Sequence, residues 1–232
     1  MITHRPGTAR GRFDHGWLRT AHTFSFADYV DPAHMGFRSL RVINEDHIAA
    51  GQGFGTHPHR DMEILTWVLD GALAHEDSMG HGATLRPGEV QVMSAGTGIL
   101  HSEFNASDGT DTHLLQIWLL PERRGLEPRY DQKAVDPASM QDRLAHLAGP
   151  PGAGAVVDLH QDAHLYVGRL GAGAAVEHAL AEGRGAWVQV ARGRVRLGEL
   201  QLQQGDGAAL EGEAAVRLTA LEPAEVLVFD LG

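Results

Sequence analysis

The chain has 232 residues, of which 43% are hydrophobic and 21% are charged, an ordinary balance for a soluble globular protein. It contains no cysteine, which excludes disulfides, iron–sulfur clusters, thiolate metal sites and a cysteine nucleophile. The net charge is -11 and neither half of the chain is basic, so direct binding of DNA or RNA is disfavoured. Histidine is unusually frequent, with 15 residues, most of them in the first half of the chain.

No segment of the sequence is long and apolar enough to span a membrane. The longest run without Asp, Glu, Lys or Arg extends from Leu144 to Val157 and contains two prolines, whereas a spanning helix needs roughly 18 apolar residues. The first residues, Met1 to Gly16, include basic side chains but lack the apolar stretch of a secretory signal. We therefore expect a cytoplasmic protein without membrane contact.

Short apolar runs, separated by glycine, proline and aspartate, predict an all-β fold. Turn pairs such as Asp70-Gly71 and Pro87-Gly88 alternate with runs of the length and composition of strands. One window, Pro137 to Leu147, has apolar residues at helical spacing and predicts a short helix. It lies in a proline- and glycine-rich segment, 121–154, that we interpret as the connection between two β units. The clearest predicted strands are Ser39–Ile43, Ile64–Leu69, Val90–Ser94, Leu114–Leu120, Ala186–Val190 and Val226–Asp230.

The two units, 1–134 and 135–232, have similar patterns. In each, a strand, turn and strand are followed at about the same distance by a second such pattern. The turns lie at Gly71 and Gly88 in the first unit and at Gly193 and Gly205 in the second. This repetition indicates an internal duplication, and predicts two antiparallel barrels or sandwiches of related topology.

Two pairs of side chains in the first unit predict a metal site. Side chains on a strand alternate between its faces, so His57 and His59 point to the same side. Pro58 between them suits an edge or bulged strand. His101 and Glu103 form a second pair with the same spacing, and three imidazoles and a carboxylate converge if the two strands are neighbours. This donor set suits Fe, Mn, Co, Ni, Cu or Zn, and does not suit a Mg or Ca site.

The same residues carry a resemblance to the cupin superfamily. Two stretches are similar to the cupin motifs, Gly51-x5-His57-x-His59-x3-Glu63 and Gly88-x5-Ser94-x-Gly96 followed by His101-x3-Asn105. The chain more closely resembles the pirin family, in particular the bacterial pirin-like quercetin 2,3-dioxygenases, in the segments His22–Pro32, His57–Arg60, Ala74–Gly80, Pro87–Ile99, His101–Glu103 and Val226–Leu231. The resemblance implies a bicupin of two jelly-roll-like antiparallel β-barrels, the first binding metal and the second a degenerate cupin without metal.

The pirin resemblance implies that His57, His59, His101 and Glu103 bind one divalent non-haem metal, usually iron(II). In many cupins with a single motif the acidic ligand lies in the first motif, at the place of Glu63, and strand alternation permits either carboxylate. The pirin resemblance implies that Glu103, and not Glu63, is the acidic ligand. Glu63 then becomes a candidate acceptor for the free N–H of a ligand imidazole, or simply a side chain at a strand end.

The resemblance also implies a dioxygenase that opens the heterocyclic ring of a flavonol such as quercetin with O2 and releases CO. Glu103, if only weakly bound to the metal, would serve as the catalytic base in an apolar pocket at the barrel mouth. Candidate wall residues are His75, His81 and Met93. The alternative that the family implies is a metal-dependent redox-sensing regulator that acts through protein partners without turnover. A cupin isomerase or a metal-independent sugar-binding module would not need three converging histidines.

Most remaining histidines are expected to be structural. In the first unit five occur singly, which favours surface positions or ordinary hydrogen bonding: His4, His15, His34, His47 and His113. In the second unit none forms a His-x-His pair, so we expect no metal there: His146, His160, His164 and His178.

Overall fold

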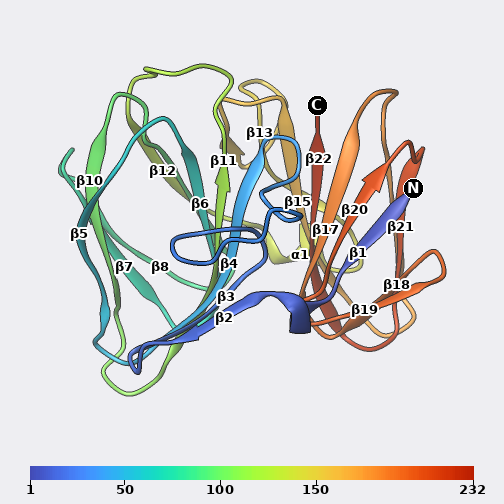
Figure 1. Cartoon of the computed structure of the whole chain (residues 1–232), viewed down its shortest axis with the longest axis horizontal. Coiled ribbons are helices and arrows are strands. Elements are labelled where there is room, and N and C mark those ends of the chain that lie inside the picture. Colours follow the sequence, from blue (N-terminus) through green and yellow to red (C-terminus); the bar gives the residue numbers. More distant parts are fainter.

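The computed structural model describes residues 1–232 and consists of two β-barrels that lie side by side, each built from a seven-stranded and a four-stranded sheet (Figure 1). The larger sheet of the first barrel contains β2 (Gly11–Asp14), β3 (Leu18–His22), β4 (Leu40–Ile48), β6 (Glu63–Asp70), β9 (Glu89–Ser94), β11 (Thr112–Leu119) and β12 (Arg129–Ala134), in the order β12-β9-β6-β11-β4-β3-β2. The smaller sheet contains β5 (Gly53–His59), β7 (Leu73–Asp77), β8 (Gly82–Leu85) and β10 (Ile99–Asn105), in the order β5-β10-β7-β8.

The second barrel repeats this plan. Its larger sheet contains β1 (Ile2–Arg5), β13 (Ala145–Gly149), β14 (Val157–Asp158), β15 (Ala163–Leu170), β17 (Gly185–Arg192), β20 (Gly207–Glu211) and β22 (Ala224–Leu231), in the order β1-β20-β17-β22-β15-β13-β14. Its smaller sheet contains β16 (Ala175–Ala179), β18 (Arg194–Leu197), β19 (Leu200–Gln203) and β21 (Ala215–Ala220), in the order β16-β21-β18-β19. Strand β1 belongs to the first 134 residues but lies in the second barrel, where it pairs with β20 (Figure 1).

The order of the strands supports the predicted duplication. If β4 to β11 are matched in turn with β15 to β22, the central strands of the larger sheets and all strands of the smaller sheets follow the same order. The turn between β6 and β7 and its counterpart between β17 and β18 each contain a glycine with positive φ, 80° at Gly71 and 72° at Gly193. Such a backbone conformation favours glycine, which explains why the same turn signal occurs in both halves.

The largest hydrophobic core lies between the two larger sheets. It comprises 26 buried residues, among them Trp67 and Leu115 of the first barrel and Leu165 and Phe229 of the second. Because these sheets are covered on both faces, their central strands are buried along most of their length, and seven of the eight residues of β6 are buried. This double covering explains why the predicted strands in these sheets read as continuous apolar runs.

The predicted helix at Pro137–Leu147 is largely wrong. The structure has only α1 (Pro137–Met140), where the Asp136 side chain accepts a hydrogen bond from the Ala138 N–H, besides the short 3-10 turn η1 (Gly7–Ala9). The remainder of the window enters β13, and Leu147 is buried in the core between the barrels. Tertiary burial therefore overrides the helical spacing of a few apolar residues. No helix has the length and apolar character that crossing a bilayer requires.

Candidate metal centre

The candidate site is built on two neighbouring strands of the smaller sheet of the first barrel. Strands β5 and β10 pair antiparallel, and His57 lies directly opposite His101. Strand β5 is the outer strand of its sheet, as Pro58 predicts, because a proline cannot donate to a ladder. Burial alternates along β10, so that His101 and Glu103 are buried, whereas Leu100 and Phe104 on the other face are 47% and 41% exposed. The two strands thus have the arrangement that the predicted site requires.

The three histidines present their ring nitrogens to one point. His57 Nε2 and His101 Nε2 lie 3.0 Å apart, and the donor nitrogens of both residues and of His59 lie within 4.8 Å of one another. The carbonyl oxygen of Gly55 lies 2.8 Å from His57 Nδ1 and accepts a hydrogen bond from it. The proton of this ring is therefore on Nδ1, and the lone pair of Nε2 is free. The Nε2 atom of His75 lies 3.1 Å from His101 Nδ1, so that the other ring nitrogen of His101, Nε2, faces His57. These residues fit a divalent transition metal.

Burial keeps the imidazoles in the form that binds metal. It lowers the pKa of His59 to about 4, and the nearby His57 lowers it further. It also lowers the pKa of His101 to about 2, with smaller effects from the surrounding imidazoles. Both rings are therefore neutral at pH 7, and a neutral imidazole is the ligand form.

Glu103 lies beside the three histidines. Gln116, on the facing sheet, donates from Nε2 to both of its carboxylate oxygens, at 2.8 and 2.9 Å. Burial raises the pKa of Glu103 to about 7, although the hydrogen bond from Gln116 opposes this shift. The carboxylate does not belong to the group of donors that lie within 4.8 Å of one another. The structure thus brings the three histidines together and places Glu103 next to them, held by Gln116.

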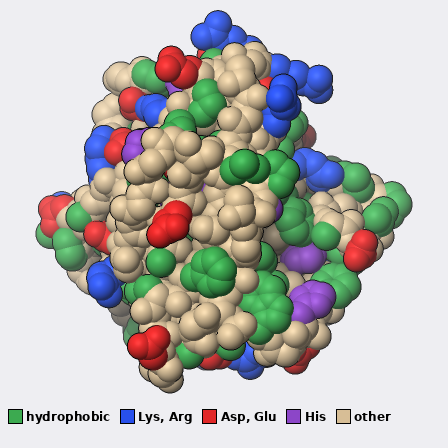
Figure 2. Space-filling view, turned by 90° about the vertical axis from the view of Figure 1, so that its left-hand side faces the viewer, with side chains coloured by type: hydrophobic (Ala, Val, Ile, Leu, Met, Phe, Trp, Pro, Cys, Tyr) green, Lys and Arg blue, Asp and Glu red, His purple; other side chains and the backbone are tan.

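The histidines and Glu103 line one cavity of about 240 Å3 between the two sheets of the first barrel. Its walls include three aromatic side chains, and Trp118 stands edge-on to His59 with ring centroids 4.8 Å apart. In the face drawn in Figure 2, histidine side chains reach the surface beside hydrophobic ones. The remaining lining residues are Phe26, Asn44, Asp46, Phe54, Ile64 and Gln116. A cavity that combines aromatic walls with convergent polar groups is typical of a site for a small molecule.

Comparison with known proteins decides the family. The family model described as Pirin matches residues 4–119, and a second model, described as the quercetinase C-terminal cupin domain, matches residues 146–231. This chain belongs to the pirin family. Both halves of this pirin are therefore cupin domains, in agreement with the two barrels of the structure.

Relatives match this pirin over its full length. The quercetin 2,3-dioxygenase of Escherichia coli (strain K12) is 47% identical, covering 100% of this chain and 99% of that protein. A pirin-like protein of Caulobacter vibrioides is 39% identical and covers 99% of each chain. The crystal structure of YhhW from Escherichia coli has a TM-score of 0.96 at 46% identity, covering 100% of this chain and 98% of that chain. The bacterial pirin YhhW in complex with nickel(II) has a TM-score of 0.94 at the same identity, covering 100% and 99%.

Of the two roles considered for Glu63, the structure supports a side chain at a strand end, the first residue of β6, and not a partner of a ligand imidazole. Glu63 is buried and accepts hydrogen bonds from Ser94 Oγ at 2.9 Å and from the backbone N–H of His160 at 3.1 Å. It therefore links the first barrel to the second. The side chain that does contact a ligand candidate is His75, which sequence analysis treated only as a possible wall residue. The pairing of β7 with β10, which brings His75 to His101, has no signal in the sequence.

The other proposed wall residues also lie outside the cavity. His81 is exposed, and its Nδ1 lies 3.0 Å from Asp77 Oδ2. Met93 is buried in a small cluster with Ile64 and Ile99. The walls are instead aromatic side chains from the segment after β3 and from β5 and β11, whose positions depend on the three-dimensional closure of the barrel.

A second group of donors, Glu45, His47 and His113, lies on the opposite face of the larger sheet. Glu45 is already engaged, with Arg10 Nη2 at 2.7 Å and His113 Nε2 at 3.0 Å. The rings of His47 and His113 are stacked, with centroids 4.0 Å apart and planes inclined by 14°. Nitrogen lone pairs lie in the ring planes, so those of two parallel rings do not converge on one ion. We interpret this group as structural, as expected for histidines that occur singly.

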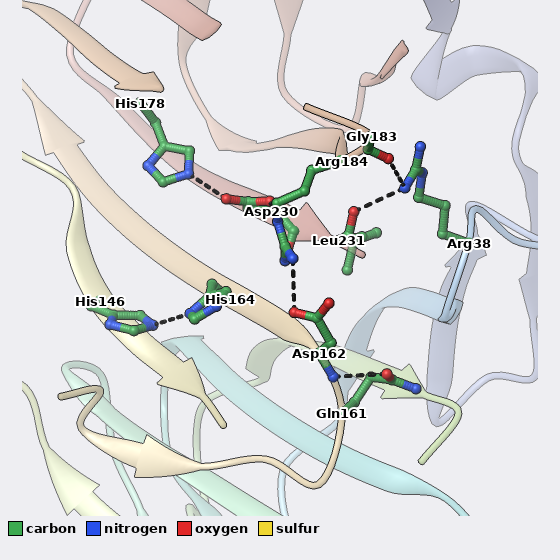
Figure 3. A network of polar contacts seen from close by, with 10 residues as sticks. All are labelled: Arg38, His146, Gln161, Asp162, His164, His178, Gly183, Arg184, Asp230 and Leu231. Atoms are coloured by element: carbon green, nitrogen blue, oxygen red, sulfur yellow. Dashed lines mark hydrogen bonds and ion pairs between the residues drawn. The ribbon is translucent and has the colours of Figure 1, made fainter. Parts of the chain in front are cut away.

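In the second barrel, histidines pair without forming a group of three donors (Figure 3). His164 Nδ1 lies 3.1 Å from His146 Nε2. His178 Nε2 lies 2.8 Å from Asp230 Oδ2, and Asp230 also accepts from Arg184. Asp230 therefore faces an arginine and a histidine, and its pKa is lowered by both even though burial alone would raise it.

Proposed function

We propose that this pirin is a metal-dependent dioxygenase that cleaves the heterocyclic ring of a flavonol such as quercetin with O2 and releases CO. His57, His59, His101 and Glu103 would bind one divalent transition metal, with iron(II) as the first choice and Mn, Co, Ni, Cu and Zn as alternatives. The activity named for the Escherichia coli relative supports the reaction, and the nickel-bound YhhW supports a metal centre in this fold.

The observation that carries the proposal is the convergence of three imidazoles on a cavity with aromatic walls. Three neutral ligands and at most one carboxylate leave a divalent ion with net positive charge, which favours an anionic oxygen ligand. The rings of Phe26, Phe54 and Trp118 supply flat apolar surface on which an aromatic substrate can lie.

The residues around the cavity have separate tasks in this reaction. A metal held by His57, His59, His101 and Glu103 would supply Lewis acidity toward the deprotonated 3-hydroxyl of the flavonol. Glu103 accepts the proton of that hydroxyl at a carboxylate oxygen, and Gln116 Nε2 holds the carboxylate in place through both oxygens. The Gly55 carbonyl and His75 fix the orientation of the rings of His57 and His101. Phe26 and Trp118 form an apolar wall of the cavity.

Metal analysis followed by aerobic incubation with quercetin tests the proposal. We expect about one metal per chain, consumption of O2 and release of CO above the rate of free metal in solution. His57→Ala should abolish both metal binding and turnover. His81→Ala is the matched control, because this exposed histidine lies outside the cavity. Stoichiometric iron without O2 consumption or CO release would overturn the dioxygenase assignment and favour the metal-dependent regulator that acts through protein partners.

A further inference from the structure

A second cavity adjoins the metal-side cavity and has about 280 Å3. It lies between the segment that connects β3 to β4 and the ends of β4 and β11, and eight of its ten lining residues are hydrophobic. Phe26 and Trp118 line both cavities, and their rings meet edge to face with centroids 5.2 Å apart. The two cavities therefore share this ring pair as a common wall.

The sizes of the two cavities argue that they serve one ligand. Sites for small molecules usually have roughly 300 to 1,000 Å3, and the metal-side cavity of about 240 Å3 falls below that range. Together with the second cavity, the total volume lies well within the range for small-molecule sites. A molecule with two linked aromatic groups can thus place one ring beside the histidines and the other beyond Phe26 and Trp118.

Arg41 is the unusual polar residue of the second cavity. Its guanidinium makes no hydrogen bond or ion pair, and its Nη1 atom is fully buried without a partner. The other polar groups there are occupied. Ser25 Oγ bonds to the backbone of Asp31, and the Tyr29 hydroxyl contacts Arg5 Nη2 at 2.9 Å. Arginine stays charged at every physiological pH. Arg41 as a whole is half-buried, but a guanidinium nitrogen that is shielded from water is normally paired. An unpaired guanidinium in an apolar cavity therefore fits an anionic oxygen supplied by a ligand.

We propose that the second cavity binds the distal ring of the aromatic substrate and that Arg41 pairs with an acidic oxygen on that ring. The substrate class is thus an extended polyphenol or aromatic acid that carries a phenolate or carboxylate at the end remote from its metal-binding oxygens. This inference rests on the proposed function for the metal-binding end of the ligand. Arg41 determines specificity and takes no part in the proton transfer at Glu103.

Equilibrium binding to the metal-free protein, without O2, tests the subsite separately from turnover. The probes are 4-hydroxycinnamate, a flat aromatic carboxylate, and its methyl ester, which has nearly the same shape without the charge. Arg41→Met removes a charge-assisted hydrogen bond, so it should weaken binding of the carboxylate at least about ten-fold and leave the ester within about two-fold. Arg41→Lys should restore part of the affinity. Arg196→Met, at an exposed position of β18 in the second barrel, is the control for the change in net charge.

Two outcomes overturn the inference. One is carboxylate binding by Arg41→Met that equals that of the unaltered protein. The other concerns Val30, which lines the cavity and is 69% exposed, so that a large side chain there should not disturb folding. Val30→Trp should obstruct the cavity and weaken both probes, and unchanged binding would show that the ligand lies elsewhere. If quercetin is turned over, Arg41→Met should raise KM and leave kcat near its original value. Absence of turnover together with Arg41-dependent binding would reject the dioxygenase and retain the subsite.

Discussion

The Nε2 atom of His75 lies 3.1 Å from His101 Nδ1, and both side chains are almost completely buried. This contact makes His75 a positioning residue for the candidate metal centre, because it fixes which nitrogen of His101 faces the cavity. Loss of such a partner typically lowers metal affinity roughly 10- to 100-fold. We therefore expect His75→Ala to weaken metal binding by that factor, measured by competition with a chromophoric chelator.

A purely structural role for His75 predicts a different result. In that case His75→Ala would lower the melting temperature of the metal-free protein without a specific loss of metal affinity. His75→Gln, which keeps a polar atom near His101, should recover part of the affinity. His81→Ala serves as the control, because its imidazole is exposed and contacts Asp77 and not the candidate ligands.

Replacing Glu103 and replacing Glu63 should have different effects on metal binding. Glu103→Ala removes the carboxylate beside the histidines, so we expect loss of bound metal, measured by elemental analysis of the purified protein. Glu63→Ala should retain metal. It leaves Ser94 Oγ and the His160 N–H without their acceptor, so the free energy of unfolding should fall by roughly 1 to 3 kcal/mol in urea titrations. Metal retained by Glu103→Ala and lost by Glu63→Ala would reverse the assignment.

The acid sensitivity of the fold should depend on Glu45. Burial raises the pKa of this carboxyl, but hydrogen bonds and charges from His113 and Arg10 prevail and lower it from 4.5 to about 2. A depressed pKa stabilises the folded state above pH 4.5, and the stabilisation is lost as the pH falls from 4.5 toward 2. The contribution at neutral pH is on the order of 3 kcal/mol. Urea unfolding between pH 7 and pH 3 should show this loss.

Glu45→Gln provides the comparison for that titration. The amide cannot ionise, so the variant should be less stable at pH 7 and should lose less stability between pH 4.5 and pH 3. If the two proteins have parallel pH profiles over this interval, the ion pair with Arg10 does not account for the acid sensitivity.

Sequence reasoning predicted the parts of the fold that depend on short-range pattern. The apolar runs at Ile64–Leu69 and Val226–Asp230 are central strands, since burial on both faces requires nearly continuous apolar residues. The glycines at the turns after β6 and β17 marked the duplication, because positive φ restricts the residue type there. The prediction of a helix at Pro137–Leu147 was wrong because a short buried strand and a helix can have similar spacing of apolar residues. Leu147 satisfies both patterns, and only the interface between the barrels decides between them.

The candidate site was predictable where ligands share a strand. Alternation placed His57 with His59 and His101 with Glu103, and the structure pairs the two strands. The contact of His75 with His101 and the aromatic walls depend instead on which strands become neighbours after barrel closure. Arg41 gave no signal for the same reason, since an unpaired guanidinium is recognised only from the absence of partners in three dimensions.

The second barrel should bind no metal. Strand β21, the counterpart of β10, contains no histidine, and His178 on the counterpart of β5 is already paired with Asp230. His146 and His164 offer two nitrogens without a third donor near them. We therefore expect one metal per chain, abolished by His57→Ala and retained when both His146 and His164 are replaced by Ala. Elemental analysis of each variant after removal of weakly bound ions measures this. A ratio near two that survives His57→Ala would show that the second barrel holds a site of its own.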